Sequence, residues 1–372
     1  MLILYLRTGG GHISAARALK EAFERHEAVE VHLFNPLGRG RVFTRWLIEK
    51  GYRRASSGFR SFWPFVYEAS KLPWFMDLSQ RLFSLVFRAD VADYVRRHSI
   101  TRIVSVHFLH SCLINDVRRR FRERRIRICT VVTDPFTAHP MWFRRRYSRR
   151  IVFSERLRTL AIEKYGFHPQ RVACLPIILR REFQTRLAAP RVRQLKEEFG
   201  FAPEKRLVLL AGGGEGLSNG ERLLTELARS TLDFELAIVC GNSDDLYRKC
   251  RRAAQAVRDR KIAVYGFTDR MYDLMNICDV VIAKAGPATV MEVLLLRKPL
   301  IITSYMYGQE RGNVEFVVDN RLGFFVQRPA GVRDRVEHIL GDERNLKIIR
   351  ENIARVEIRN GTDQIADYIL DS

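Results

Sequence analysis

Short apolar runs alternate with longer amphipathic segments along almost the whole chain, and this alternation limits the fold more than any other feature. The apolar runs span residues 2–6, 29–34, 102–106, 126–133, 151–153 and 171–175 in the first half, and 206–211, 234–239, 261–265, 280–283 and 300–303 in the second. Runs of this length predict buried strands, and the helical periodicity between them predicts crossover helices. The sequence therefore predicts an α/β protein with parallel, doubly wound sheets.

A break in the alternation at residues 187–193 divides the chain into two halves. A length of 372 residues is enough for two domains that each have their own core. We predict an N-terminal domain of residues 1–188 and a C-terminal domain of residues 189–372, both Rossmann-like. The charged helical segment at residues 342–370 belongs to the second domain by position, with packing back on the first as the alternative. Two such domains facing a cleft describe the GT-B architecture.

Residues 284–325 read as a strand, a turn at Gly286 and Pro287, a helix, a second strand and a polar loop. This order predicts a helix N-terminus at the carboxyl ends of parallel strands, where open α/β sheets bind ligands. The free N–H groups there suit a phosphate, and Glu292 can accept hydrogen bonds from a ribose. Three polar residues that follow suit sugar hydroxyls: Gln309, Glu310 and Asn313. The stretch is typical of a nucleotide-sugar site.

A glycine run and a histidine follow the first predicted strand. Gly10 and Gly11 precede His12, which opens the first predicted helix. A neutral imidazole at the carboxyl edge of a sheet can remove a proton from a hydroxyl, and a helix N-terminus lowers a histidine pKa and favours that neutral form. A histidine that only caps the helix fits the same pattern equally well.

A second glycine loop, residues 212–216, follows the strand predicted at residues 206–211. Amides in such a loop, which includes Gly213, Gly214 and Glu215, can cradle a diphosphate. No Gly-Lys-Ser/Thr follows, and the glycine spacing is not GxGxxG, so neither a Walker A loop nor a dinucleotide site is predicted. The alternative is a flexible turn.

A loop with two prolines ends the strand predicted at residues 126–133. Asp134 is placed there to orient His12 or to act as a base itself, and His139 is either a site residue or a satisfied loop histidine. The carboxylates of Asp269, Asp273 and Asp279 lack metal-ligand spacing, so we predict no metal site and no cofactor.

The net charge of +22 favours an anionic partner. Residues 37–87 mix aromatic and basic side chains, which predicts interfacial helices on anionic lipid, although an ordinary core with a solvated face fits too. Arginine clusters at residues 118–127 and 144–150 suit a bilayer or nucleic acid phosphates. Because no RNA-stacking motif accompanies them, we favour a membrane surface and expect no nucleic acid partner.

Six scattered cysteines without a CxxC pair indicate reduced core residues. No run is apolar and long enough to span a bilayer, and the N-terminal apolar run is too short for a signal peptide. We therefore expect a cytoplasmic protein, peripheral on the cytoplasmic face of the membrane.

Together, these motifs resemble those of a known family. They read, in order, GGGHISAARAL, VVTDPFTAHPMWF, LLAGGGEG, VYGFTDRMYDLM, KAGPATVMEVLLLRKPLII and GQERGNVEFVV. The chain resembles the monogalactosyldiacylglycerol synthases and the bacterial processive diacylglycerol glucosyltransferases of glycosyltransferase family 28. The resemblance implies a GT-B fold and an inverting, metal-independent transfer of galactose or glucose from a UDP-sugar to diacylglycerol, which forms a β-glycolipid.

The resemblance also implies roles for single residues. His12 would be the catalytic residue on the acceptor side, and Asp134 its partner or the base. Further acceptor-side residues would be Gly10, Gly11, His139 and Trp142. Donor-site residues would be Gly213, Gly214 and Glu215 near the diphosphate, Phe267 beside the uracil, Gly286, Pro287, Ala288 and Thr289 at the phosphate-facing helix, Glu292 on the ribose, and Gln309, Glu310 and Asn313 around the sugar.

The chain departs from the family pattern at three places. Ala288 stands where the family usually has Gly, Pro135 follows the aspartate where Leu is common, and residues 217–219 lack the usual Met-Gly. These departures leave the donor sugar and the acceptor open. The alternatives are another lipid-linked or soluble acceptor and, from a different class, a basic nucleic-acid-binding protein.

Overall fold

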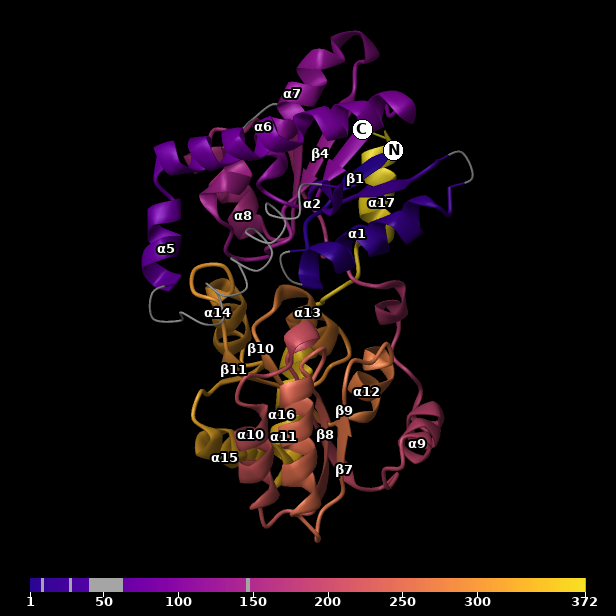
Figure 1. The fold of residues 1–372 in the computed structure, drawn as a ribbon. Helices are drawn as coiled ribbons and strands as arrows, with labels where there is room; N and C mark the ends of the chain where they lie inside the picture. The colour runs from indigo at the N-terminus through magenta and orange to yellow at the C-terminus, as the bar shows by residue number, and fades with distance from the viewer. Residues whose placement is uncertain (8–9, 27–28, 40–62, 145–147, 372) are drawn as a thin grey trace. The chain divides into compact units, whose positions relative to one another are not determined.

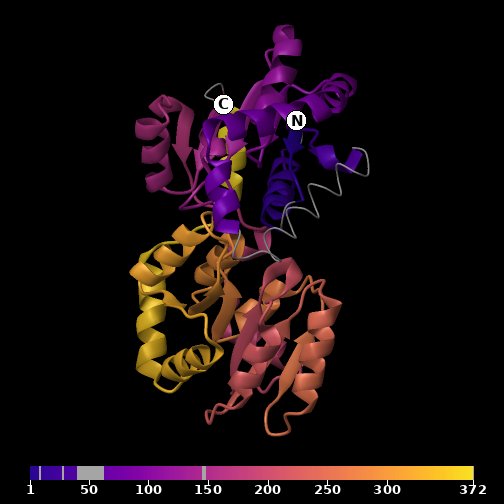
Figure 2. The same cartoon turned by 60° about the vertical axis from the view of Figure 1, so that its left-hand side comes forward.

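The computed structural model describes residues 1–7, 10–26, 29–39, 63–144 and 148–371. The contacts divide the chain into two compact units. Unit 1 comprises Met1–Arg181, Met306–Gly312 and Asn360–Ser372, and unit 2 comprises Glu182–Tyr305 and Asn313–Arg359. Each unit is an α/β body built on its own sheet (Figures 1 and 2).

Unit 1 is built on sheet A, six parallel strands in the order β2-β1-β3-β4-β5-β6. Its strands are β1 (Leu2–Leu4), β2 (His32–Phe34), β3 (Arg102–Ser105), β4 (Arg127–Val131), β5 (Arg149–Val152) and β6 (Val172–Cys174). Its α-helices are α1 (Gly10–Phe23), α2 (Pro36–Arg39), α5 (Trp63–Ser70), α6 (Pro73–Arg97), α7 (His110–Arg120), α8 (Glu155–Thr159) and α17 (Thr362–Asp371).

The alternation of side chains along β1 explains the three layers of unit 1. Leu2 and Leu4 pack with Phe83 and Phe87 of α6, whereas Ile3 lies in a second core with residues of α1 and α17. Successive strand residues point to opposite faces of the sheet, so an unbroken apolar run needs helices on both sides. Figure 1 shows the C-terminal helix α17 beside α1, which agrees with the contacts between the two.

Unit 2 is built on sheet B, six parallel strands in the order β12-β11-β10-β7-β8-β9. Its strands are β7 (Arg206–Ala211), β8 (Phe234–Val239), β9 (Ile262–Tyr265), β10 (Val280–Lys284), β11 (Leu300–Ser304) and β12 (Gly323–Phe325). Its α-helices are α9 (Ala189–Glu198), α10 (Gly220–Ala228), α11 (Asp244–Gln255), α12 (Met271–Ile277), α13 (Pro287–Leu295), α14 (Arg311–Asp319), α15 (Pro329–Leu340) and α16 (Glu343–Arg355).

Two sequence expectations need correction. The predicted linker at residues 187–193 is partly helical, because α9 begins at Ala189 with Pro190 in its first turn, where its fixed φ suits a helix. The short strand β12 carries only three residues, Gly-Phe-Phe, and was not predicted. The doubly wound parallel architecture itself is confirmed.

Candidate active site

Each sheet has one point where the strand order reverses, between β1 and β3 in sheet A and between β7 and β10 in sheet B. Loops leave the sheet in opposite directions at such a point, which opens a crevice at the carboxyl ends of the strands. The glycine loops of the sequence follow β1 and β7 directly. The topology therefore places both predicted motifs at the usual ligand-binding positions of their sheets.

His12 lies in the first turn of α1, and its neighbours fix its tautomer. Its Nδ1 is 2.8 Å from the carbonyl oxygen of Val106 and 3.0 Å from Oγ1 of Thr133. A carbonyl oxygen only accepts, so Nδ1 carries the proton and donates, and the lone pair of a neutral ring lies on Nε2. Nε2 makes no hydrogen bond to a described residue. His12 is thus oriented as a proton acceptor through Nε2.

Burial lowers the pKa of His12 to about 4, and the bond to Val106 opposes this shift only in part. The ring is therefore neutral at pH 7, as the sequence predicts. The sequence-based reason, a helix N-terminus, is not the main cause, because burial dominates. The neighbouring Gly11 leaves open space, since a Cβ there would meet no described atom within 4 Å.

Two further histidines of the β3–α7 segment lie beside His12, and the sequence reasoning missed both. The ring of His107 is 4.7 Å from that of His12 in an edge-to-face arrangement, and Nδ1 of His110 is 3.0 Å from Oγ of Ser105. Both rings are buried, and burial lowers the pKa of His107 and lowers that of His110 to about 3. The rings of His107 and His110 are therefore neutral, and that of His107 packs directly against His12. Two histidines directly after a predicted strand are the signal that could have identified them.

Asp134 follows β4, and its Oδ2 accepts a 2.9 Å hydrogen bond from the indole N–H of Trp142. Burial raises the pKa of Asp134 to about 7, against the Trp142 bond, and the charge of Glu310 raises it further. One role predicted for Asp134 is to orient His12, but the hydrogen-bond partners of the His12 Nδ1 are Val106 and Thr133. The structure therefore leaves Asp134 better suited as a proton acceptor than as the group that orients His12.

His139 and Trp142 are buried behind Asp134. The Nδ1 of His139 accepts from the backbone N–H of Met141 at 3.2 Å, and its Nε2 is 3.0 Å from Oγ of Ser70. Trp142 is fully buried. Both ring nitrogens of His139 are engaged, so the satisfied-histidine alternative fits its geometry better than contact with an acceptor.

Gln309 and Glu310, predicted to hold the sugar, lie on the segment Met306–Gly312 that packs within unit 1. The hydroxyl of Thr137 donates to the carbonyl oxygen of Gln309 at 2.7 Å, and Oε2 of Glu310 accepts from the N–H of Met306 at 2.6 Å. The structure thus brings this loop to the segment that contains Asp134. The two segments are more than a hundred residues apart in the chain, and the sequence pattern does not reveal their contact.

In unit 2 the loop after β7 forms a single 3-10 turn, Gly213–Glu215, whose residues are exposed. Gly213 has φ +71°, and a Cβ at the neighbouring Gly241 would come within 2.4 Å of the carbonyl oxygen of Gly214. The N–H of Asn242 donates to that same oxygen at 2.8 Å. Glycine is therefore required here by backbone geometry, and the loop is held in one shape.

Helix α13 follows β10, the strand that lies next to β7 in sheet B. Gly286 is its N-cap without a side-chain cap, and Pro287 occupies the first turn, so the N–H groups of Ala288 and Thr289 have no intrahelical acceptor. Glu292 on the same helix is buried, with 7% of its surface exposed. This end of α13 can bind an anion.

Lys284, the last residue of β10, is a cation that the sequence reasoning did not assign to the site. Its Nζ lies 3.9 Å from the position of a Cβ on Gly213, and it makes no hydrogen bond or ion pair with a described residue. Asn313 of α14 contacts the residue that follows Lys284: its Nδ2 donates to the carbonyl oxygen of Ala285 at 2.8 Å. The Oδ1 of Asn313 is buried and has no partner among the described residues.

Phe267, predicted to lie beside the uracil, follows β9, and 70% of its surface is exposed. An exposed aromatic face can stack on a base. Its role stays a prediction, since β9 is the edge strand of sheet B and not part of the switch point.

The predicted interfacial region, residues 37–87, is only partly described, because residues 40–62 lie outside the described ranges. In the described part, apolar side chains gather on one side of α6 and the residue before it. Those with at least a third of their surface exposed are Leu72, Trp74, Phe75, Leu78, Leu82, Leu85 and Val86, which we call the α6 apolar face. Arg81 and Arg88 are exposed on the same helix. Among the described helices, none combines the length and apolar content needed to cross a membrane.

The two arginine clusters differ. Arg118, Arg119 and Arg120 are exposed at the end of α7. Arg150 of the second cluster is fully buried, and its Nε donates to the carbonyl oxygen of Trp142 at 3.0 Å. The prediction that both clusters face an anionic partner is therefore wrong for Arg150, which has a structural contact instead.

Comparisons with known proteins identify relatives of this chain. A family model described as the glycosyltransferase family 28 C-terminal domain matches residues 207–328, and a model described as monogalactosyldiacylglycerol (MGDG) synthase matches residues 12–177. A probable chloroplastic monogalactosyldiacylglycerol synthase from Nicotiana tabacum is 27% identical over 96% of this chain and 67% of its own length. A processive diacylglycerol beta-glucosyltransferase from Bacillus licheniformis is 24% identical over 100% of this chain and 94% of its own.

Solved structures support the fold. MurG from Acinetobacter baumannii has a TM-score of 0.67 at 14% identity, covering 100% of this chain and 99% of that one. HepE from Anabaena, solved in complex with UDP, has a TM-score of 0.60 at 14% identity, covering 100% of both chains. The predicted GT-B fold and the family resemblance are confirmed.

Proposed function

We propose that this chain, a glycosyltransferase with a family 28 C-terminal domain and an N-terminal region related to the MGDG synthases, transfers a hexose from a UDP-sugar to diacylglycerol and forms a β-glycolipid. The relatives named above act, by their names, on diacylglycerol or make its galactolipid. Galactose and glucose both remain candidate sugars, because relatives named for each of the two sugars are found.

The orientation of His12 is the observation that carries this proposal. Its Nδ1 is committed to Val106 and Thr133, so Nε2 is free to take a proton. The acceptor hydroxyl gives its proton to Nε2 while its oxygen forms the new bond to the anomeric carbon. The bond from that carbon to the UDP oxygen breaks on the opposite side, which inverts the configuration and releases UDP.

Asp134 is the second candidate for the base. Because its pKa is about 7, the carboxylate of Asp134 is the stronger base of the two. The pKa of His12 is about 4, so a larger fraction of its imidazole is unprotonated at neutral pH. The two groups follow β1 and β4, which both flank β3 at the carboxyl edge of sheet A, so either is a candidate base for one acceptor hydroxyl. The pH profile of transfer separates them, as described below.

We further propose that the donor diphosphate is held in unit 2 without a metal ion. The exposed amides of Gly213 and Gly214, the uncapped N-terminus of α13 and the Lys284 ammonium can all meet negative charge on the leaving UDP. Glu292 would accept hydrogen bonds from the ribose. Transfer should then be equally fast with magnesium and with a chelator.

The α6 apolar face supports a peripheral position on an anionic membrane. Eight of the twelve large apolar side chains that are exposed in the described part of the chain fall between Phe65 and Val86. Apolar side chains flanked by exposed arginines suit the boundary between headgroups and acyl chains. We expect this face to dock on the cytoplasmic side of the membrane, where diacylglycerol is presented.

The direct test uses the purified chain, diacylglycerol in phosphatidylglycerol-containing vesicles and a panel of UDP-sugars, with glycolipid detected by mass spectrometry. Product from one donor would support the proposal and identify the sugar. If UDP-sugar binds or hydrolyses but no lipid product forms, the acceptor assignment is wrong and another lipid-linked or soluble acceptor replaces it. Salt-sensitive RNA binding without affinity for UDP would instead favour the nucleic-acid alternative.

A further inference from the structure

Two histidines and one glutamate lie together at the amino-terminal edge of sheet A, the edge opposite to the one that carries His12. Glu30 precedes β2, His32 is the first residue of β2, and His98 caps the carboxyl end of α6. The backbone N–H of His32 donates to the carbonyl oxygen of Met1 at 3.0 Å, which holds this end of β2 in the sheet. The three residues therefore come from two separate elements of unit 1.

The distances between their polar atoms fit a shared ion. One ligand atom of each residue lies within 4.8 Å of the other two. The Nε2 of His32 is 3.1 Å from Oε1 of Glu30, and the rings of His32 and His98 are 4.5 Å apart between centroids. Ligand atoms around tetrahedral zinc are roughly 3.4 Å apart, given zinc–ligand bonds of about 2.0–2.1 Å.

The contact between His32 and Glu30 is close but is not a satisfied hydrogen bond. The Nε2 of His32 is shielded from solvent and has no hydrogen-bond partner in the described part of the chain. Its other nitrogen, Nδ1, is 3.1 Å from the hydroxyl of Tyr94. A histidine that binds a metal through one nitrogen usually hydrogen-bonds through the other, and Tyr94 provides that support.

The other two side chains are available to a ligand. The side chain of His98 is exposed and makes no hydrogen bond to a described residue, and the Glu30 side chain is 80% exposed, with its Oε1 3.1 Å from Nε2 of His32. An ion can therefore enter from solvent.

We propose that Glu30, His32 and His98 bind a divalent transition-metal ion of the zinc class. Two imidazoles and one carboxylate form a known zinc ligand set, with water in the fourth position. The bound ion joins the edge strand β2 to the end of α6 and stabilises unit 1. It has no part in the transfer reaction, because it lies at the opposite edge of the sheet from His12.

Equilibrium dialysis of the full chain without a histidine tag, followed by elemental analysis, tests this site. We expect one zinc ion per chain, an affinity at least tenfold weaker in His98→Ala and Glu30→Gln, and no change in His26→Ala. His26 is the matched control, because it is also a partly exposed histidine of unit 1 beside a carboxylate, Asp367 at 3.4 Å.

A second measurement separates the site from misfolding and from binding elsewhere. Zinc should raise the melting temperature of the wild type and of His26→Ala but not of His98→Ala, whose metal-free melting temperature should equal that of the wild type. Zinc binding that is undetectable in the wild type, or that persists undiminished in His98→Ala, would overturn the proposal.

Discussion

At the scale of single residues, the decisive groups are oriented by distant parts of the chain. His12 is held by Val106 and Thr133, which follow different strands. The sequence predicted His12, Asp134 and the glycine loops, because each follows a strand directly. It missed His107, His110 and Lys284 and left the role of His139 open, because burial and long-range contacts decide what those side chains face.

Substitution of His12 by alanine should lower the transfer rate by about 10²–10⁴-fold and leave UDP binding nearly unchanged, because a general base contributes that much and the donor groups lie in unit 2. Steady-state kinetics and UDP calorimetry would measure both quantities. A variant that keeps full activity would exclude His12 as the base.

The acid limb of the rate profile identifies the base. If Nε2 of His12 takes the proton, the rate should fall only as the pH approaches about 4, the pKa of His12. If Asp134 is the base, the limb should lie near pH 7, the pKa of that carboxyl. The limb near pH 7 should disappear in Asp134→Asn only if Asp134 is the base. Circular dichroism would check that the variant is folded.

Replacement of Lys284 by methionine should lower kcat/KM by about 10²-fold, because the ammonium would stabilise charge on the leaving diphosphate. Lys205→Met is the control, since Lys205 is an exposed residue of the same unit paired with Asp233 at 2.8 Å. Equal activity of the two variants would remove Lys284 from the donor site.

At the scale of elements, α6 has one buried and one exposed apolar side. Met76, Phe83 and Phe87 face the core, while the α6 apolar face is turned to solvent. Helical spacing predicted a helix here, but the same spacing fits a core helix and an interfacial one. Only the packing of the opposite side distinguishes the two.

The double variant Leu82→Ser and Leu85→Ser should weaken flotation with phosphatidylglycerol vesicles, because it removes apolar area from the α6 apolar face. Ile348→Ser, which alters an exposed residue of α16 in unit 2, should float like the wild type. Unchanged flotation of the double variant, at an unchanged melting temperature, would mean that lipid docks elsewhere.

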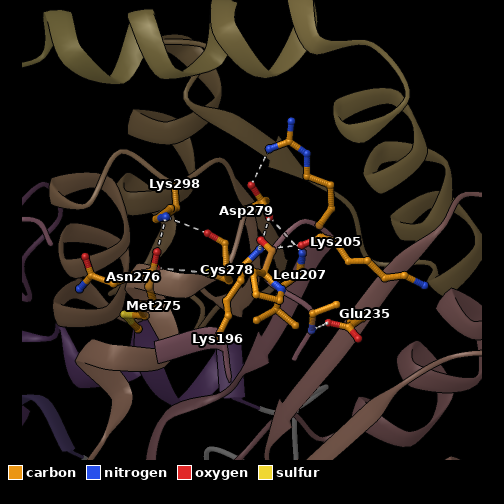
Figure 3. A network of polar contacts seen from close by, with 12 residues as sticks. Lys196, Lys205, Leu207, Glu235, Met275, Asn276, Cys278, Asp279 and Lys298 are labelled. Atoms are coloured by element: carbon orange, nitrogen blue, oxygen red, sulfur yellow. Dashed lines mark hydrogen bonds and ion pairs between the residues drawn. The ribbon is translucent and has the colours of Figure 1, made fainter. Parts of the chain in front are cut away.

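Asp279, which precedes β10, contacts residues of β7 and α9 in unit 2 (Figure 3). Its carboxylate accepts from the guanidinium of Arg206 at 2.9 Å and from the N–H of Leu207 at 3.0 Å, with Lys196 at 4.0 Å. Nearby, the ammonium of Lys298 donates to the carbonyl oxygens of Asn276 and Cys278, both at 2.7 Å, although burial lowers its pKa.

Asp279→Asn should therefore reduce the free energy of unfolding by about 3 kcal/mol, because it leaves the buried Lys196 without its carboxylate partner. Urea denaturation would measure the change. Glu343→Gln is the control, since it removes the exposed partner of Arg206 and should change stability by less than about 1 kcal/mol.

At the scale of the whole molecule, buried neutral histidines should make unit 1 sensitive to acid. Burial lowers the pKa of His107, of His110 to about 3 and of His139 to about 4, so the unfolded chain binds more protons than the native one below pH 6.5. Stability should therefore fall as the pH drops from 6.5 towards 4. The raised pKa of Asp134 acts in the opposite direction between its unfolded value of 3.8 and about 7, but it is one group against four, because burial also lowers the pKa of His12 to about 4.

The melting temperature followed from pH 7 to pH 4 would measure this effect. A melting temperature that rises on acidification would contradict the assignment of neutral buried histidines. His139→Gln should flatten the curve, because the amide removes one of the titrating groups.

The doubly wound architecture could be predicted because apolar runs and helical periodicity are local signals. The membership of each unit could be predicted only in part, because packing of the terminal helix on the first domain was one alternative and the assignment of Met306–Gly312 was not foreseen. Residues of Met306–Gly312 and Asn360–Ser372 join unit 1 through contacts such as Thr137 with Gln309 and α1 with α17. Contacts between residues so far apart in sequence leave no periodic trace.

This discontinuity has a consequence for synthesis. Residues of β1 and α1 leave the ribosome before unit 2 is made, yet Ile365, Ala366 and Ile369 of the same core emerge after it. Unit 2 can fold once Arg359 has emerged, while one face of sheet A still lacks the cover of α17. During that interval unit 1 has an exposed apolar sheet face, although most of its residues were made first.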